Sequence, residues 1–244
     1  MIEETAELSA PISSARPRLL TILDFISGFL LAVATLMVFL YAPIEAVMGP
    51  VQKVFYFHVS AAWVGMLSFL VAAVVGILYL RSRDNRLDVM AVAAVELGMV
   101  FMLIAIVAGS IWARPIWNTW WTWDPRLTTV TIMELIYAAY LMLRNGIEEP
   151  ERRARFGAVY AIVGFISVPL TFFSIRIFRT IHPVVIGSGD PSAAGTFDMI
   201  APMAQTFALS LVAFTVIFAD LLWHRYRLGQ RSARVEQMKM KLME

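Results

Sequence analysis

The 244-residue sequence contains no cysteine, and only 16% of its residues are Asp, Glu, Lys or Arg. The lack of cysteine excludes disulfide bonds, thiolate metal sites, thiol catalysis and thioether attachment of a prosthetic group to this chain. Soluble domains contain about a quarter charged residues. Because 59% of the residues are hydrophobic and the mean hydropathy is +0.72, the composition excludes a soluble enzyme, a disordered protein and a nucleic-acid binder. The net charge of +2 is too small to indicate a polyanionic partner.

Six apolar runs are long enough to cross a bilayer as helices, which takes about 18 residues or more. The pieces between them are too short for a soluble domain. The sequence therefore predicts an all-α integral membrane protein, in which residues 1–244 form a single bundle of six transmembrane helices. The first run lacks a small-residue cleavage site and is expected to be a retained signal anchor. The predicted spans are about 19–41, 59–80, 89–112, 127–143, 157–178 and 200–223.

The distribution of Lys and Arg predicts the orientation, because cytoplasmic loops are enriched in these residues. With the N-terminus in the cytoplasm, 15 basic residues lie inside and 5 outside. Both termini are therefore predicted to be cytoplasmic. The three outward loops are then about 42–58, 113–126 and 179–199.

Two of the three histidines and most of the tryptophans fall in these outward loops. His58 ends the first loop and His182 lies in the third. A single His or Trp at the end of a span is usually an interfacial residue. Five tryptophans between residues 112 and 123 exceed what anchoring requires, so some of them must face a ligand, a partner or the protein interior. They are Trp112, Trp117, Trp120, Trp121 and Trp123.

These residue types together indicate a haem site. A broad aromatic surface at the membrane edge suits a flat, lipid-soluble molecule. Two neutral imidazoles on separate segments are able to bind a metal at its centre from opposite faces, as iron porphyrin allows. Its propionates would pair with cations, for which the outward loops offer Arg114, Arg126 and Arg179. The alternative for these arginines is pairing with lipid headgroups.

Charged residues within the predicted spans are costly and have packing or functional roles. We expect interhelical hydrogen bonds for Glu96 and Glu134. Asp24 and Asp220 lie near the cytoplasmic edge, where water can solvate them, and His224 is expected to be interfacial on that same side. Arg176, near the outer end of its span, either extends to the lipid surface or reaches the site.

Two segments resemble a known family. The stretch Gly109–Trp112, followed by Trp117–Thr128, resembles the tryptophan-rich WWD signature of the haem-handling proteins of cytochrome c biogenesis. The stretch Phe55–Trp63 is similar to the first histidine motif of one branch, cytochrome c maturation protein C (CcmC). The resemblance covers nearly the whole chain, and the WWD signature is specific for the superfamily.

The resemblance implies a non-enzymatic function. A CcmC protein binds haem b non-covalently at the outer, periplasmic face of the bacterial cytoplasmic (inner) membrane and delivers it to the haem chaperone CcmE. It works with the ATP-binding-cassette pair CcmA and CcmB and the small membrane subunit CcmD. Carried over to this sequence, His58 and His182 are the axial ligands of the haem iron. The platform is formed by Trp117, Trp120, Trp121, Trp123 and Asp124.

Two other functions remain open from the sequence. One is the haem-transporting synthetase of the other cytochrome c pathway, whose members are longer and usually carry further histidines within spans. The other is a channel or small-solute transporter whose tryptophans are interfacial anchors. A haem Soret band in the purified protein would separate the haem-handling proteins from a channel.

The charge asymmetry gives a testable topology. Cysteines introduced by Ser192→Cys and Ser232→Cys should react with a membrane-impermeant reagent from opposite sides of the membrane. Because the sequence has no native cysteine, the unmodified chain is the background control. Labelling of both positions from the same side would contradict the six-span topology.

Overall fold

The structure, a computed structural model, describes residues 16–178, 180–183 and 199–243, and the regular elements within these ranges are helices. Six helical segments are long and apolar enough to cross a membrane, which confirms the predicted all-helical class of multi-pass membrane protein. The helices are α2 (Arg18–Leu36, continued by the π-helical turn η1, Met37–Tyr41), α3 (Val54–Ser82, preceded by the 3-10 turn η2, Pro50–Lys53), α4 (Asn85–Trp117), α5 (Pro125–Asn145), α6 (Pro150–Gly164), α7 (Ser167–Ile177) and α8 (Ala201–Met243).

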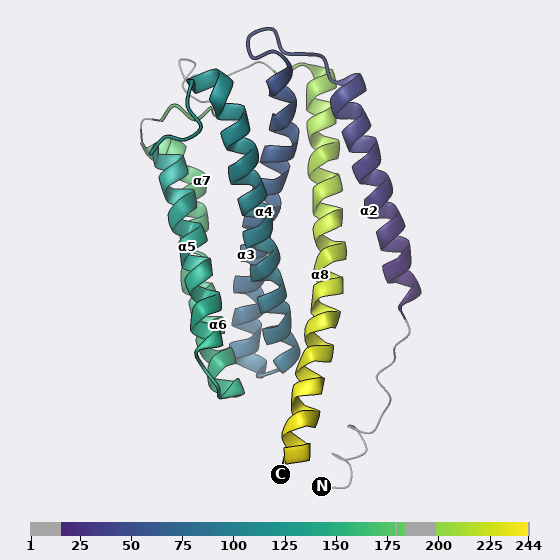
Figure 1. Cartoon of the computed structure of the whole chain (residues 1–244), viewed down its shortest axis with the longest axis vertical. Helices are drawn as coiled ribbons and strands as arrows, with labels where there is room; N and C mark the ends of the chain where they lie inside the picture. Colours follow the sequence, from purple (N-terminus) through teal and green to yellow (C-terminus); the bar gives the residue numbers. More distant parts are fainter. Residues whose placement is uncertain (1–15, 179, 184–198, 244) are drawn as a thin grey trace.

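The helices run side by side along the long axis of the molecule (Figure 1). α3 packs along α4 in the middle of the bundle, α5 contacts α6 and α7 on one side, and α2 packs on α8 on the other. The start of α2 and the end of α8 lie at the same end of the bundle, here called the terminal end. The opposite end, called the loop end, holds the connection 42–49 and the connection 118–124.

α3 begins earlier than the predicted span, and His58 therefore lies in a helix and not in the predicted loop 42–58. Pro50 starts the turn η2, which leads directly into α3. Proline is well suited to the first position of a helix because its missing N–H would have no partner there. The side chains of Phe55 and Tyr56 are fully buried, and Phe55 packs on Trp112 and Phe207, so tertiary contacts hold this first turn in helical form.

The predicted loop 113–126 is shorter in the structure, at 118–124. α4 continues through Pro115 in its last turn and ends at Trp117. The next residue, Asn118, has a left-handed φ of 54°, a conformation that Asn tolerates better than most residues. α5 starts at Pro125, and the Asp124 side chain accepts hydrogen bonds from the N–H groups of Arg126 and Leu127. The left-handed residue after α4 and the N-cap of α5 therefore fix the two ends of the tryptophan-rich connection.

The fifth predicted span is divided into α6 and α7. Pro169 has no N–H to donate to the carbonyl of Phe165, and the N–H of Val168 donates to that carbonyl instead, at 3.0 Å. The sixth span continues as α8 to Met243, well past the predicted end at residue 223. Of the predicted third outward loop, 179–199, only residues 180–183 and 199 are among the described residues.

Small residues allow α3 and α4 to approach closely, as is common between helices in membranes. A Cβ atom on Gly98 would lie 2.6 Å from Cε1 of Phe69, and one on Gly65 would lie 2.8 Å from Cε of Met102. Large apolar side chains such as Phe25 and Phe29 of α2 are exposed on the outside of the bundle, where lipid would surround them.

This packing predicts that Gly98→Ala destabilises the protein by about 1–3 kcal/mol, because the added methyl group must displace the Phe69 ring in a filled interface. Gly28→Ala is the matched control, since no atom lies within 4 Å of the position of a Cβ there and Ala favours a helix over Gly by about 1 kcal/mol. Thermal unfolding in detergent should show a lower midpoint for Gly98→Ala and no loss for Gly28→Ala. Equal midpoints for both variants would contradict the close contact.

Candidate functional site

The His58 side chain projects from α3 and is oriented by α4. Its Nδ1 lies 2.7 Å from the carbonyl oxygen of Ala105. Because a carbonyl only accepts, Nδ1 carries the hydrogen, and in the neutral ring the lone pair of Nε2 is then available. A Cβ on Gly109 would lie 2.7 Å from Cε1 of His58, so the imidazole rests directly against the backbone of α4 at this glycine.

His182, on the segment that follows α7, faces His58. The two ring centroids are 6.4 Å apart, with the ring planes inclined by 40°. His182 Nδ1 lies 3.0 Å from the carbonyl oxygen of Pro183, which again leaves Nε2 as the acceptor. Burial, together with the nearby charge of Arg126, lowers the pKa of His182 to about 3. The ring is therefore neutral near pH 7, the form in which imidazole binds metals.

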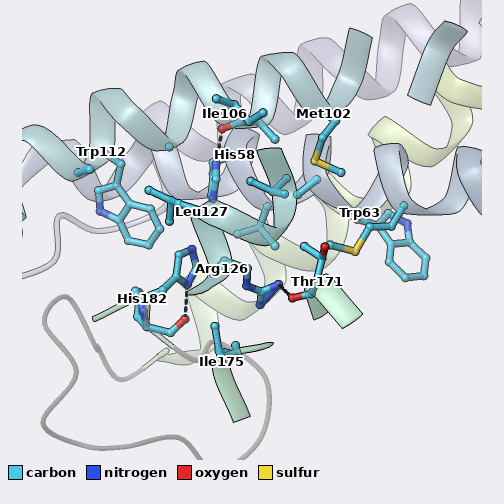
Figure 2. Close-up of a pocket in the computed structure, with 18 of the residues that line it drawn as sticks. His58, Trp63, Met102, Ile106, Trp112, Arg126, Leu127, Thr171, Ile175 and His182 are labelled. Atoms are coloured by element: carbon cyan, nitrogen blue, oxygen red, sulfur yellow. Dashed lines mark hydrogen bonds between the residues drawn. The ribbon is translucent and has the colours of Figure 1, made fainter. Parts of the chain in front are cut away.

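Both histidines line one cavity of about 570 Å³. Figure 2 shows His58, His182 and Arg126 around one part of this cavity, with Trp63 and Met102 further along it. The wall is largely aromatic and aliphatic. It includes Trp63, Met66, Met102, Ile106, Trp112, Trp117, Trp120, Trp121, Leu127, Val130, Phe172, Phe207 and Val212.

The structure brings six of the ten predicted site residues to this cavity and leaves four away from its wall or undescribed. His58, His182, Trp117, Trp120, Trp121 and Arg126 line the cavity. Trp123 does not line it and is 73% exposed. Arg114 turns back to donate to Oδ1 of Asn118 at 2.6 Å and lies over the ring of Trp120. Asp124 is buried and does not line the cavity, and Arg179 is outside the described residues.

Several wall residues were missed by the sequence prediction, which took its aromatic site residues and histidines from the outward loops. Trp63, Met66 and Met102 extend the cavity along the helices away from the loop end. The spacing of four residues between His58, Ala62 and Met66 places all three on one face of α3. The four-residue period could therefore have predicted that Ala62 and Met66 line the cavity, because residues on the same helical face as a candidate ligand point into the same space.

Two arginines supply positive charge to the cavity wall, namely Arg126 of α5 and Arg176 of α7. Arg126 donates from Nη1 to the carbonyl oxygen of Thr171 at 3.3 Å. Its Nε is buried and has no hydrogen-bond partner among the described residues. A buried donor without a partner is costly, so this group is suited to an acidic group of a bound ligand. Arg176 lines the cavity, which agrees with the interpretation that it reaches the site and not with the alternative that it extends to the lipid surface.

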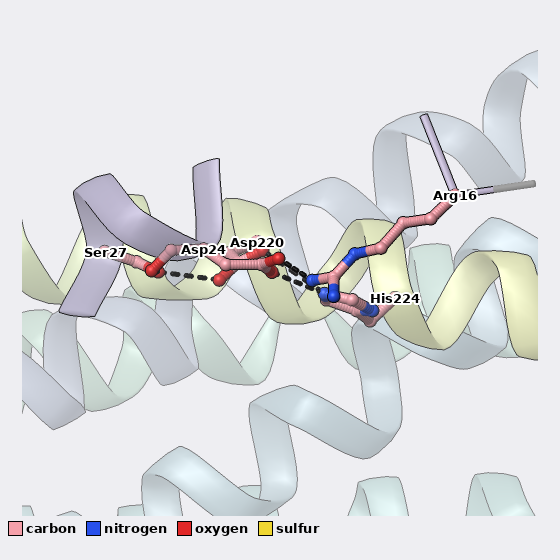
Figure 3. Close-up of polar contacts among 5 residues, drawn as sticks. All are labelled: Arg16, Asp24, Ser27, Asp220 and His224. Atoms are coloured by element: carbon pink, nitrogen blue, oxygen red, sulfur yellow. Dashed lines mark hydrogen bonds and ion pairs between the residues drawn. The ribbon is translucent and has the colours of Figure 1, made fainter. Parts of the chain in front are cut away.

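The third histidine lies in a separate polar cluster between α2 and α8 (Figure 3). His224 Nε2 is 2.7 Å from Oδ1 of Asp24, and Ser27 donates to Asp220 at 2.7 Å. Arg16 forms an ion pair with Asp24. The expectation that water solvates Asp220 is wrong, because this residue is 8% exposed and its carboxylate oxygens face Ser27 and His224.

The two glutamates within the spans differ from each other. Glu96 of α4 pairs with Arg225 of α8 at 2.8 Å, which confirms the predicted interhelical bond. Oε2 of Glu134 is buried and has no hydrogen-bond partner among the described residues, so the corresponding expectation for Glu134 finds no support.

The fold and the site define a class: a multi-pass helical membrane protein with an apolar, tryptophan-lined cavity in which two imidazoles face each other. Within that class, the chain belongs to the family described as CcmC, Heme exporter protein C, which matches residues 5–241.

Individual relatives agree with this assignment. Heme exporter protein C of Bradyrhizobium diazoefficiens is 34% identical over 182 residues, covering 74% of this chain and 67% of the relative. The protein of the same description from Rhodobacter capsulatus is 31% identical, with 83% of each chain covered. That of Escherichia coli K12 is 32% identical over 58% of each chain.

Proposed function

We propose that this protein binds haem b non-covalently through His58 and His182 and delivers it to a haem chaperone during cytochrome c biogenesis. The observation that carries the proposal is the 6.4 Å separation of the two imidazole centroids across the cavity. Two metal–nitrogen bonds of about 2 Å each, together with the half-widths of the two rings, give a centroid separation of about 6 Å for imidazoles bound on opposite sides of one iron.

The cavity fits the remainder of the ligand. Its volume of about 570 Å³ is within the range of about 300–1,000 Å³ typical of sites for ligands of this size. Trp117, Trp120 and Trp121 provide the aromatic platform for the porphyrin. Arg126 and Arg176 are the cations that would pair with its propionates. Arg114 and Trp123, which lie away from the wall, are not needed for this contact.

The chemistry of the site supports binding and hand-over of a cargo. The bound haem would supply an iron with two axial positions and a reactive periphery. The chain supplies two neutral ligands, an aromatic surface and cations, which hold and orient a molecule. Delivery is proposed to be to CcmE, with the ABC-type subunits CcmA and CcmB and the small subunit CcmD as further partners.

The loop end is proposed to face the periplasm, and both termini the cytoplasm of a bacterial inner membrane. The distribution of 15 basic residues against 5 supports this orientation. The start of α2 and the end of α8 lie at the same end of the bundle (Figure 1), as an even number of crossings requires. The cavity with both histidines would then open near the outer surface.

The alternatives weighed from the sequence fit less well. A channel would not need two imidazoles at the separation of axial ligands, and the chain belongs to the Heme exporter protein C family. The haem-transporting synthetase usually has further histidines within its spans. Here the one remaining histidine, His224, pairs with Asp24 in the cluster between α2 and α8.

The ligand assignment is tested by the visible spectrum of the haem-loaded protein. His58→Ala and His182→Ala should each leave five-coordinate haem on the other histidine, with an open position that added imidazole fills. The double variant should lose axial ligation altogether. His224→Ala is the control and should keep the six-coordinate spectrum. A six-coordinate spectrum that is unchanged in His58→Ala or His182→Ala would remove that residue from the site.

The propionate contact is tested by Arg126→Gln. Loss of one charge-assisted hydrogen bond should weaken haem binding by about tenfold or more, measured by Soret titration. Arg114→Gln is the matched control, because Arg114 does not line the cavity. With the dimethyl ester of haem, whose carboxylates are blocked, the wild-type protein and Arg126→Gln should bind equally. An equal loss with the ester would mean that Arg126 acts through its bond to Thr171 and not through the propionate.

A further inference from the structure

Asp124 has no place on the cavity wall, yet it is among the most highly connected polar side chains near it. It is 8% exposed. Its Oδ1 accepts from the N–H of Arg126 at 2.9 Å and from that of Leu127 at 3.4 Å. Its Oδ2 accepts from the hydroxyl of Thr180 and from the N–H of Ile181, the latter at 3.2 Å. One carboxylate therefore joins the start of α5 to the segment that carries His182.

The connection continues to the histidine itself. The hydroxyl oxygen of Thr180 accepts the N–H of His182 at 3.0 Å. Pro183 follows and restricts the backbone of His182 to extended conformations. The ring of His182 packs against Trp117, with centroids 6.3 Å apart. A chain of hydrogen bonds thus runs from the first turn of α5, through Asp124 and Thr180, to the backbone of His182.

This arrangement requires a carboxylate and not merely a capping residue. Asn is an equally good N-cap, so the bonds from Arg126 and Leu127 would survive its introduction. The second oxygen would become an NH₂ group, which cannot accept from the N–H of Ile181. The bond from the N–H of Ile181, one of the two that Oδ2 accepts from the His182 segment, would therefore be lost while the helix cap remains, and that N–H would be left without its acceptor.

We propose that Asp124 is a positioning residue that holds His182 opposite His58, and that it does not contact the haem. This inference rests on the proposed function, in which His182 is an axial ligand. His58 needs no such device, because α3 and α4 fix it through Ala105 and Gly109. Positioning of this kind is common around metal ligands, whose hydrogen-bonded supports hold their orientation.

The test compares Asp124→Asn with the two histidine variants in the full-length purified protein loaded with haem. Asp124→Asn should retain haem on His58, show a five-coordinate fraction that added imidazole converts to six-coordinate, and release haem roughly tenfold faster. Combined with His182→Ala, it should cause no further change. Combined with His58→Ala, it should remove most of the remaining haem, because His182 is then the only ligand.

Matched variants separate positioning from a general effect on the fold. Asp84→Asn alters the cap of α4, where Asp84 accepts from the N–H of Arg86 at 2.8 Å, and should keep the wild-type spectrum. Thr180→Val should reproduce the effect of Asp124→Asn, whereas Thr180→Ser, which keeps the hydroxyl, should keep the six-coordinate spectrum of the wild-type protein.

Two results would overturn the inference while leaving the proposed function in place. One is an unchanged spectrum and release rate in Asp124→Asn. The other is an added loss of haem when Asp124→Asn is combined with His182→Ala, which would show that Asp124 acts elsewhere. If wild-type protein binds no haem, or if neither histidine variant changes its spectrum, the proposed function itself fails and the inference fails with it.

Discussion

The packing of α3 directly on α4 is the contact on which the geometry of the site depends. In a bilayer, helices gain little from burying apolar surface against one another, and close van der Waals contact between backbones takes its place. Gly65 and Gly98 allow that contact through the middle of the bundle, and Gly109 allows it beside His58. The position of the His58 imidazole is therefore a direct consequence of how closely the two helices approach.

The second imidazole is held in a different way. His182 lies outside the helices, where its backbone N–H donates to the hydroxyl of Thr180, which in turn donates to Asp124. A side chain that is fixed by helix packing moves only with its helix. A side chain on a connecting segment can move away when a few hydrogen bonds open. In the proposed function, in which haem is handed on, the His182 side of the cavity would therefore open at the smaller free-energy cost.

Charged residues are distributed in accordance with their cost inside a membrane. Away from the cavity, three pairs join helices, namely Arg144 with Asp88 at 2.6 Å, Arg225 with Glu96, and His224 with Asp24. Around the cavity, Arg126 and Arg176 line the wall. The pairs between helices hold the bundle together, and the cavity arginines contribute positive charge to a region suited to an acidic, otherwise apolar molecule.

The sequence alone was sufficient for the class of fold, since hydropathy requires helices wherever the backbone crosses lipid and must satisfy its own hydrogen bonds. It also singled out His58, His182 and the tryptophan segment by composition and position.

The sequence could not show that His58 is helical, because tertiary contacts of Phe55 and Tyr56 extend α3 toward Pro50. Nor could it separate Trp117 and Trp121, which line the cavity, from Trp123, which is exposed, because Trp117 ends α4 and the other two lie in the irregular connection that follows the left-handed residue Asn118. Trp63, Met66 and Met102 join the site only where α3, α4 and α8 converge with α5 and α7. Local pattern determines which segments are helices, but the wall of a cavity is shared by residues far apart in sequence, and only the packing of the helices brings them together.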